Sequence, residues 1–434
     1  MKKTIFSILS FCLAFSINAQ YSVKGGQGEP CMLNKEIQVC LLNGLSDAEI
    51  SFTSTSASAS TNHQWYRYDT KAAEAVQIPC TQNGATSTIT DVRDGYGYFV
   101  DLNPPVWIID YSRYLPTLHS LNIEEGNDAC EYIRLTADVE SASALEYTLH
   151  SGQKKLLPRT FHLLYKQLVW NEDNFSFSVE DKDEPLSAIA NITLDAPLVN
   201  TVFTLQGDDY AEYFGLSASV STPEYEAVAL EVHGKATSLK ESGETEQEIT
   251  VAGDRLGGSA PLEIIFDACA NEPVAGMYQW TIKKINRERN DSTLILQYKG
   301  KSVNYTFRES GTYVAQLEVL GANLVCSDDS YSQEIEIGDS DLRLPNAFSP
   351  GSSIGSNDVY RVSYKSLVKF KASIYNRWGN LLFHWEDPAQ GWDGRVNGKY
   401  VPTGVYYIVV EARGADGKKY NKTSDINILR SKNH

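Results

Sequence analysis

The fold class is decided by one stretch of the chain, Tyr305-Thr306-Phe307-Arg308-Glu309-Ser310-Gly311-Thr312-Tyr313-Val314-Ala315-Gln316-Leu317-Glu318-Val319. The run from Val314 to Val319 alternates, which indicates a half-buried β-strand. A glycine and a tyrosine stand directly before this strand, where the chain must turn into a sheet. A short strand entered through such a turn is typical of β-sandwich proteins.

The same pattern extends through the whole chain of 434 residues. Short alternating runs dominate, separated by Gly, Asn, Asp and Ser, and few amphipathic segments are long enough for helices. At roughly 100–200 residues per domain, this length allows two to four domains. The sequence therefore predicts an all-β protein made of tandem immunoglobulin-like β-sandwiches.

The first part of the chain carries three signals of such a sandwich. Trp65 lies in a strand-like run at the position of an immunoglobulin core tryptophan, and Asp94-Gly95-Tyr96-Gly97-Tyr98 resembles a tyrosine corner. The run Val106 to Tyr111 is almost wholly apolar. Burial on both faces would explain that run, so we expect it at a junction with the next domain.

The quoted stretch resembles a PKD-type immunoglobulin-like domain, through Phe307, Gly311 and Tyr313. Cys269, Trp280 and Cys326 follow the Cys…Trp…Cys order of immunoglobulin domains. The resemblance implies a disulfide between Cys269 and Cys326 that crosses the sandwich beside the tryptophan. The pairing of the other cysteines of the exported chain, Cys31, Cys40, Cys80 and Cys130, stays open.

The C-terminal residues closely resemble the gliding-motility-associated C-terminal domain, the type B sorting domain of the type IX secretion system of Bacteroidetes. Six separated pieces in the same order carry this resemblance, and their residues are Pro345, Asn346, Phe348, Pro350; Asn357, Asp358; Tyr375, Asn376, Arg377, Trp378, Gly379; Gly391, Trp392, Asp393, Gly394; Pro402, Gly404, Tyr406; and the terminal Ile428-Leu429-Arg430. The resemblance implies an outer-membrane type IX translocon as a partner.

The N-terminus has the features of a secretory signal peptide. Lys2 and Lys3 precede an apolar run, and the small residue Ala19 marks a cleavage point before Gln20. We therefore expect passage through the periplasm and then secretion or display on the outer cell surface. The predicted division is a signal peptide at 1–19, an immunoglobulin-like domain at 20–114, a β-rich domain of unclear type at 115–249, a PKD-like domain at 250–338 and the sorting domain at 342–434.

Several classes of function find no support in the sequence. A net charge of −17 would repel a phosphate backbone, so nucleic acid is not expected as a partner. No run is long and apolar enough for a transmembrane helix. We identify no catalytic residues, no metal site and no cofactor site. The acidic residues Asp181, Asp183 and Glu184 suggest a calcium loop or a solvated turn, and the missing EF-hand spacing favours the turn.

Two functions remain. The first is an exported binding or structural protein whose extracellular ligand is a glycan or a protein. The alternative is a secreted hydrolase with its active site within 115–243. Paired carboxylates or a histidine-centred group in a cleft of that region would favour the enzyme.

Overall fold

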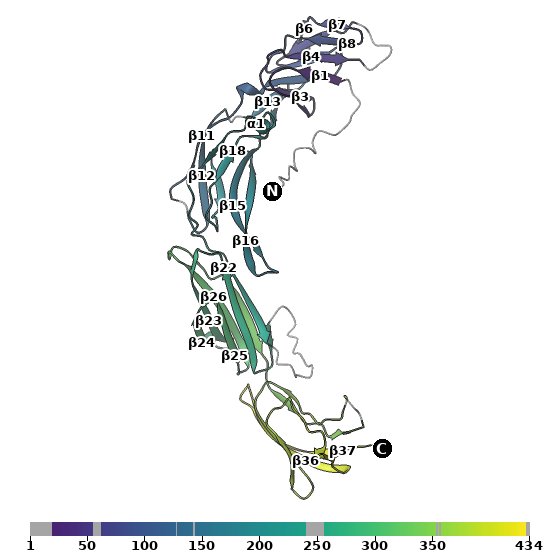
Figure 1. Ribbon diagram of the computed structural model, residues 1–434, viewed down its shortest axis with the longest axis vertical. Helices are drawn as coiled ribbons and strands as arrows, with labels where there is room; N and C mark the ends of the chain where they lie inside the picture. The colour runs from purple at the N-terminus through teal and green to yellow at the C-terminus, as the bar shows by residue number, and fades with distance from the viewer. Residues whose placement is uncertain are drawn as a thin grey trace. The chain divides into compact units, whose positions relative to one another are not determined.

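The computed structural model describes residues 20–54, 62–126, 128–141, 144–239, 256–352, 355 and 357–430 (Figure 1). The predicted signal peptide lies outside these residues. The chain forms two compact units, one of residues up to 169 together with 178–227, and one of residues 170–177 together with those from 228 onward.

The first unit begins with a sandwich of two sheets. Its four-stranded sheet has the order β1 (Gln20–Lys24), β4 (Glu49–Thr53), β8 (Thr86–Ile89) and β7 (Thr81–Asn83). Its six-stranded sheet has the order β2 (Cys31–Asn34), β3 (Gln38–Leu42), β10 (Val106–Asp110), β9 (Tyr96–Val100), β5 (Trp65–Tyr68) and β6 (Val76–Ile78). Fully buried Trp65 packs in the core between the sheets, as predicted.

Every residue of β10 is buried, which confirms the prediction for this run. Val106 and Ile108 face the sandwich core, whereas Trp107 and Ile109 face a second core on the other side of the sheet. That second core is completed by chain beyond residue 115, with β13 (Leu145–Thr148), β14 (Lys154–Leu157) and α1 (Asp209–Tyr213). The short 3-10 helices η1 (Ala72–Glu74) and η2 (Tyr111–Arg113) lie in the connections.

The rest of the first unit forms another pair of sheets around its own core. One sheet has the order β11 (Thr117–Ile123), β12 (Tyr132–Glu140) and β17 (Ile192–Asp195). The other has the order β16 (Ser176–Leu186), β15 (Phe161–Asn171), β18 (Thr204–Gln206) and β19 (Ser219–Ser221). The acidic cluster around Asp183 lies within β16, so it is part of a strand and not a turn.

The second unit contains a large sandwich followed by a smaller one. The first has a sheet of order β20 (Val232–Leu239), β22 (Leu262–Ala270) and β25 (Ser302–Phe307). Its partner sheet has the order β21 (Leu256–Gly258), β28 (Ser332–Ile337), β26 (Gly311–Gly321), β23 (Ala275–Asn286) and β24 (Asp291–Lys299), with β27 (Ser327–Asp328) paired to β26. Figure 1 shows the long strands β22, β23, β25 and β26 running alongside one another.

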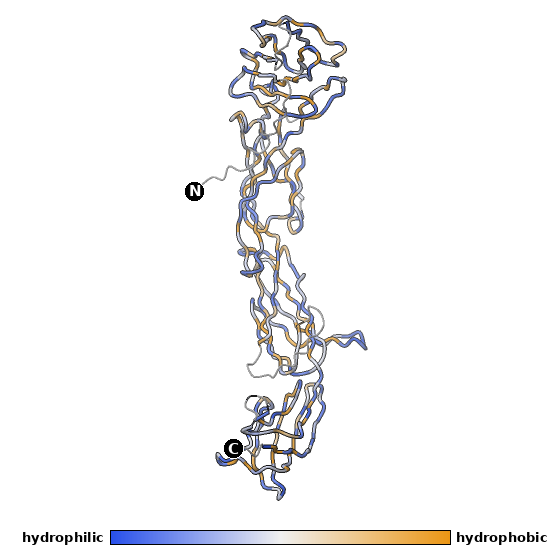
Figure 2. The backbone as a smooth tube through the Cα atoms, turned by 90° about the vertical axis from the view of Figure 1, so that its right-hand side faces the viewer, coloured by the Kyte–Doolittle hydropathy of each residue, from blue (hydrophilic) through white to orange (hydrophobic). Residues whose placement is uncertain are grey.

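The last sandwich is built on a five-stranded sheet of order β30 (Ala347–Phe348), β37 (Lys419–Ile428), β36 (Gly404–Gly414), β32 (Leu367–Tyr375) and β33 (Leu381–Trp385). Two small sheets complete it, β29 (Asp341–Arg343) with β31 (Ser363–Lys365), and β34 (Arg395–Val396) with β35 (Lys399–Tyr400). Hydrophobic and hydrophilic residues alternate in short stretches along the strands (Figure 2), as expected for sheets with one buried face.

The predicted disulfide between Cys269 and Cys326 is wrong. Cys269 carries a free thiol, whereas Cys326 is disulfide-bonded, as is Cys130. The reason is the two-residue period of β22, in which Phe266 and Ala270 are buried while Cys269 lies on the opposite face. A side chain that points away from the core cannot reach across it to form a bridge.

Candidate functional site

An aromatic cluster forms the centre of the C-terminal sandwich. Phe348, Tyr360 and Trp392 are each at most 1% exposed, and the Phe348 ring lies 5.7 Å from both of the other two. The Trp392 ring lies 5.9 Å from the ring of Tyr406. Three of these four rings belong to the motif pieces identified in the sequence, so those pieces meet in one core.

The glycines of the motif allow close packing and tight turns. A Cβ atom on Gly391 would lie 2.5 Å from the carbonyl oxygen of Tyr360, which no side chain tolerates. Gly379 and Gly394 have φ angles of +83° and +77°, in the region that favours glycine. Much of the motif therefore specifies the fold itself.

The polar motif residues also hold turns. The Oδ1 atom of Asn376 accepts hydrogen bonds from the backbone N–H groups of Trp378 and Asn380, at 3.0 and 2.9 Å. Asp393 accepts one from the N–H of Arg395 at 3.0 Å, and the carbonyl oxygens of Pro345 and Pro402 accept from the hydroxyls of Tyr360 and Tyr406. The backbone of Asn346 accepts from Asn427 and that of Asn357 from Ser349, while Pro350 is buried and Asp358 half-buried.

One pair of motif residues serves neither the core nor a turn. Trp378, in the hairpin between β32 and β33, is 70% exposed. The guanidinium of Arg377 stacks on its indole ring, 4.2 Å from the centroid. The cation–π stacking orders these two solvent-facing side chains on the surface.

Comparison with known families agrees with this geometry. Residues 342–428 match the CHU_C type IX secretion signal domain. They form a type IX secretion signal domain. This signal domain indicates that the chain is exported by the type IX secretion system. Within the described residues, no helix is long and apolar enough to span a membrane.

A second family match lies in the first unit, where residues 122–222 match a fibronectin type III domain. This supports an immunoglobulin-like fold for a region whose type the sequence did not reveal. A search of curated proteins finds no match to the chain.

A search of solved structures matches this chain to three structures at low identity. The first is a tetra-tandem repeat from the extending region of a large adhesion protein, 10% identical over 90% of this chain and 98% of that one, with a TM-score of 0.21. The second consists of three N-terminal domains of the bacteriophage RB49 outer capsid protein Hoc, 12% identical over 73% of this chain and 100% of that one, with a TM-score of 0.21. The third is dimeric latent PorU from Porphyromonas gingivalis, 11% identical over 73% of this chain and 34% of that one, with a TM-score of 0.16. Scores this low support no inference about function.

The signal domain is attached to the sandwich before it by more than the chain connection. The backbone N–H of Ala260 donates to the hydroxyl of buried Ser366 at 3.2 Å, and the N–H of Ser310 donates to the carbonyl oxygen of Ala415 at 3.2 Å. In the connecting segment, the Ser340 hydroxyl bonds Asp416 at 2.7 Å. Desolvation acts to raise the pKa of Asp416, but the hydrogen bonds from the Ser340 hydroxyl and from the backbone N–H groups of Lys418 and Ser340 outweigh it and lower that pKa.

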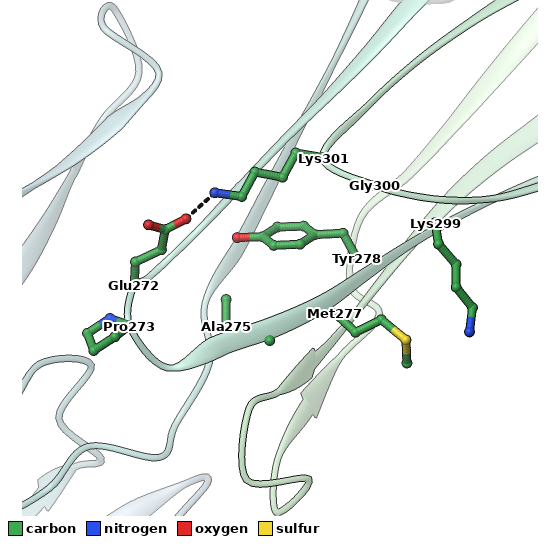
Figure 3. Close-up of a pocket in the computed structure, with 9 residues that line it drawn as sticks. Glu272, Pro273, Ala275, Met277, Tyr278, Lys299, Gly300 and Lys301 are labelled. Atoms are coloured by element: carbon green, nitrogen blue, oxygen red, sulfur yellow. Dashed lines mark hydrogen bonds and ion pairs between the residues drawn. The ribbon is translucent and has the colours of Figure 1, made fainter.

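A separate recess of about 520 Å³ lies at one end of the preceding sandwich (Figure 3). Glu272 and Lys301 form an ion pair at its rim, and the Lys301 ammonium lies 5.4 Å from the Tyr278 ring centroid. The hydrogen bond to Glu272 raises the pKa of Lys301. Burial raises the pKa of the nearby Cys269 thiol.

The first unit contains a histidine-centred group that the sequence did not reveal. His162 on β15 bonds Asp183 of β16 through Nδ1 at 2.8 Å and Asp209 of α1 through Nε2 at 2.9 Å. Burial lowers its pKa, but the bonds to Asp209 and Asp183 outweigh that effect and raise it. Both ring nitrogens are occupied, so neither is available to act as a general base.

A buried ion pair lies nearby in the same unit. Asp208 is 0% exposed and accepts hydrogen bonds from the Arg159 guanidinium, the Tyr111 hydroxyl and the N–H of Ala211. Arg159 also donates to the carbonyl oxygens of Ser141 and Tyr114. The charges are satisfied internally, which is the arrangement of a structural network. Both polar groups are therefore hydrogen-bonded within the protein, the Arg159–Asp208 pair in the interior and the His162 group at a partly exposed position. No potential metal-binding group of three side chains occurs in the described ranges.

Proposed function

We propose that this chain is a cell-surface or secreted binding or structural protein, delivered by the type IX secretion system through its C-terminal domain. The signal domain at 342–428 is the observation that carries the proposal. We divide the exported part as the sequence suggests, into domains at 20–114, 115–249 and 250–338 ahead of the signal domain at 342–434. The signal peptide at 1–19, cleaved between Ala19 and Gln20, would supply passage into the periplasm.

A physical argument supports a dedicated carrier. A folded β-sandwich cannot cross the outer membrane unaided, because its polar surface cannot be stripped of water in the bilayer. The translocon must therefore read a surface feature of the cargo. The exposed pair Arg377 and Trp378 is our candidate for that feature, since most of the other motif residues pack in the core or hold turns.

The first experiment removes residues 342–434 and measures surface protease accessibility in intact cells. We expect the truncated protein to stay in the periplasm with its signal peptide removed. A folded truncated protein that still reaches the surface would refute the sorting role. N-terminal sequencing of the exported protein should begin at Gln20.

A second experiment separates recognition from folding. Trp378→Ala should leave the thermal stability of the protein nearly unchanged, because the indole is exposed, while reducing export. Tyr407→Ala is the matched control, because Tyr407 is also an exposed aromatic residue of this domain, at 43%. Equal export of both variants would exclude Trp378 from recognition.

A gain-of-function test uses two fusions to an inert exported reporter. One carries residues 342–434 and the other carries 228–434. Because Ala260 and Ser310 hydrogen-bond the signal domain, we expect the longer fusion to be exported more efficiently.

For the domains that precede the signal domain, two observations support a binding role. The polar groups around His162 and Asp208 already have hydrogen-bond partners within the protein, and a shallow recess lies beside Tyr278. The ligand class is a glycan or a protein, and a screen of residues 20–338 against both would identify it. Hydrolysis that is lost on replacing a single carboxylate within 115–243 would instead establish the enzyme.

A further inference from the structure

Three cations stand side by side on the outer face of the five-stranded sheet of the signal domain. In the strand register Lys369 of β32 lies opposite Arg413 of β36, and Arg413 lies opposite Lys419 of β37. All three side chains are exposed. In the described part of the chain, none of the three forms an ion pair.

These cations line an open groove of about 590 Å³. Lys371 adds a fourth positive charge, and Glu386 and Glu411 are the carboxylates of the groove. Glu411 lies opposite Lys371 in the register, and Glu386 lies 3.6 Å from His384. The row of Lys369, Arg413 and Lys419 therefore has no carboxylate directly opposite any member within the sheet.

Such a row works against the stability of the sheet, because like charges directly opposite one another on neighbouring strands repel. It is also unexpected in a chain whose net charge is −17. An anionic ligand lying along the row would remove this repulsion, because its negative charges would lie against the three cations.

The spacing of the row defines that ligand further. Neighbouring strands lie about 4.8 Å apart, so three cations repeat at that interval across the sheet. This is close to the length of one sugar ring in a polysaccharide, so one anion per sugar would meet one cation per strand. An extended acidic peptide repeats its same-side residues at about 6.7 Å and fits the row less well.

We propose that this groove binds an acidic polysaccharide, one that carries a carboxylate or sulfate on successive sugars. The chain lies across β32, β36 and β37, with its anions against Lys369, Arg413 and Lys419. The guanidinium of Arg413, in the middle of the row, can hold a carboxylate through two parallel hydrogen bonds. This binding is additional to the role of the domain in export.

The test uses the full exported protein and four probes: polygalacturonate for carboxylates, dextran sulfate for sulfates, neutral dextran, and polyglutamate as an acidic peptide. We expect binding to one or both of the acidic polysaccharides, weakening with added salt, and none to neutral dextran. The triple variant K369Q/R413Q/K419Q should bind roughly tenfold or more weakly. Which acidic polymer binds identifies the anion.

Three controls keep the test specific. The variant K35Q/R289Q/R308Q removes the same charge from exposed residues that form no row, and Y407A alters the same sheet face without changing charge; both should bind as the unaltered protein does. Thermal unfolding should show the triple row variant to be at least as stable as the unaltered protein, because repulsion is removed.

Several results would overturn the proposal. One is that the two triple variants lose affinity for the acidic polysaccharide equally, and another is that K369Q/R413Q/K419Q binds it unchanged. The others are that the protein binds neutral dextran or polyglutamate as strongly as it binds the acidic polysaccharide. If the row variant binds polysaccharide normally but fails to be exported, the groove serves the translocon instead.

Discussion

The hydroxyl of Tyr406 donates a hydrogen bond of 2.9 Å to the carbonyl oxygen of Pro402, four residues upstream. Tyr313 makes the same bond to Glu309, also at 2.9 Å. In both cases a glycine two residues before the tyrosine has a φ angle near +140°, at +149° for Gly404 and +138° for Gly311. The same local corner thus introduces the central strand of two successive sandwiches.

The corner should be measurable in the stability of the signal domain. Tyr406→Phe removes one hydrogen bond while keeping the ring, so we expect a loss of about 1 kcal/mol in the free energy of unfolding. Denaturant titration of the full exported protein would measure it. Tyr407→Phe is the control, because Tyr407 is 43% exposed, and it should change the stability little. Equal stability of the two variants would show that the corner bond contributes nothing.

The buried ion pair of the first unit should be far more sensitive. Asp208→Ala leaves the Arg159 charge buried without its carboxylate, and we expect a loss of about 3–5 kcal/mol. Thermal unfolding would report it as a large fall in the melting temperature. Asp195→Ala, at an exposed position on β17, should have a small effect. A small effect of Asp208→Ala as well would mean that the network does not stabilise the fold.

His162 predicts a pH-dependent contribution to stability. Its pKa is raised above the ordinary 6.5 in the folded protein, so the protonated form is favoured by folding. The stabilisation is therefore fully present below about pH 6.5 and is lost as the pH rises through the folded pKa. The stability difference between the unaltered protein and His162→Gln should be larger at pH 5.5 than at pH 8.5.

A double variant tests whether Asp209 is the partner responsible. Because His162 and Asp209 act through one interaction, His162→Gln/Asp209→Asn should lose less than the sum of the two single variants. Strictly additive losses, or a difference that does not vary with pH, would contradict this assignment.

The cysteines give a chemical prediction. In the denatured but unreduced protein, Cys269 should react with an alkylating reagent, whereas Cys326 should react only after reduction. Mass spectrometry of the digested protein distinguishes the two states. Replacing Cys326 with Ser should cost roughly 2–5 kcal/mol, whereas Cys269→Ser should cost little. Alkylation of Cys326 without reduction would refute the bridge.

The sequence by itself determined the features that depend on near neighbours. Alternation identified the strands, the glycine–tyrosine spacing marked the corner at Tyr313, and the apolar run of β10 indicated burial on both faces. The motif of the signal domain was also legible, because its turns and aromatic core residues are fixed by local backbone geometry.

Local patterns do not reveal every strand. Strand β20 runs from Val232 to Leu239, although most of its residues are polar or small. Pairing with β22 stabilises these polar residues in extended form, which their composition does not reveal.

Only the tertiary structure decided the features that depend on how strands pair. The face of the sandwich on which Cys269 lies, the meeting of His162 with Asp183 and the row of Lys369, Arg413 and Lys419 each depend on which strands pair and in which register. A shift of one residue in that register would move every one of these side chains to the other face of its sheet. Periodicity within one strand cannot fix that register, because it is set by the packing of the whole sandwich.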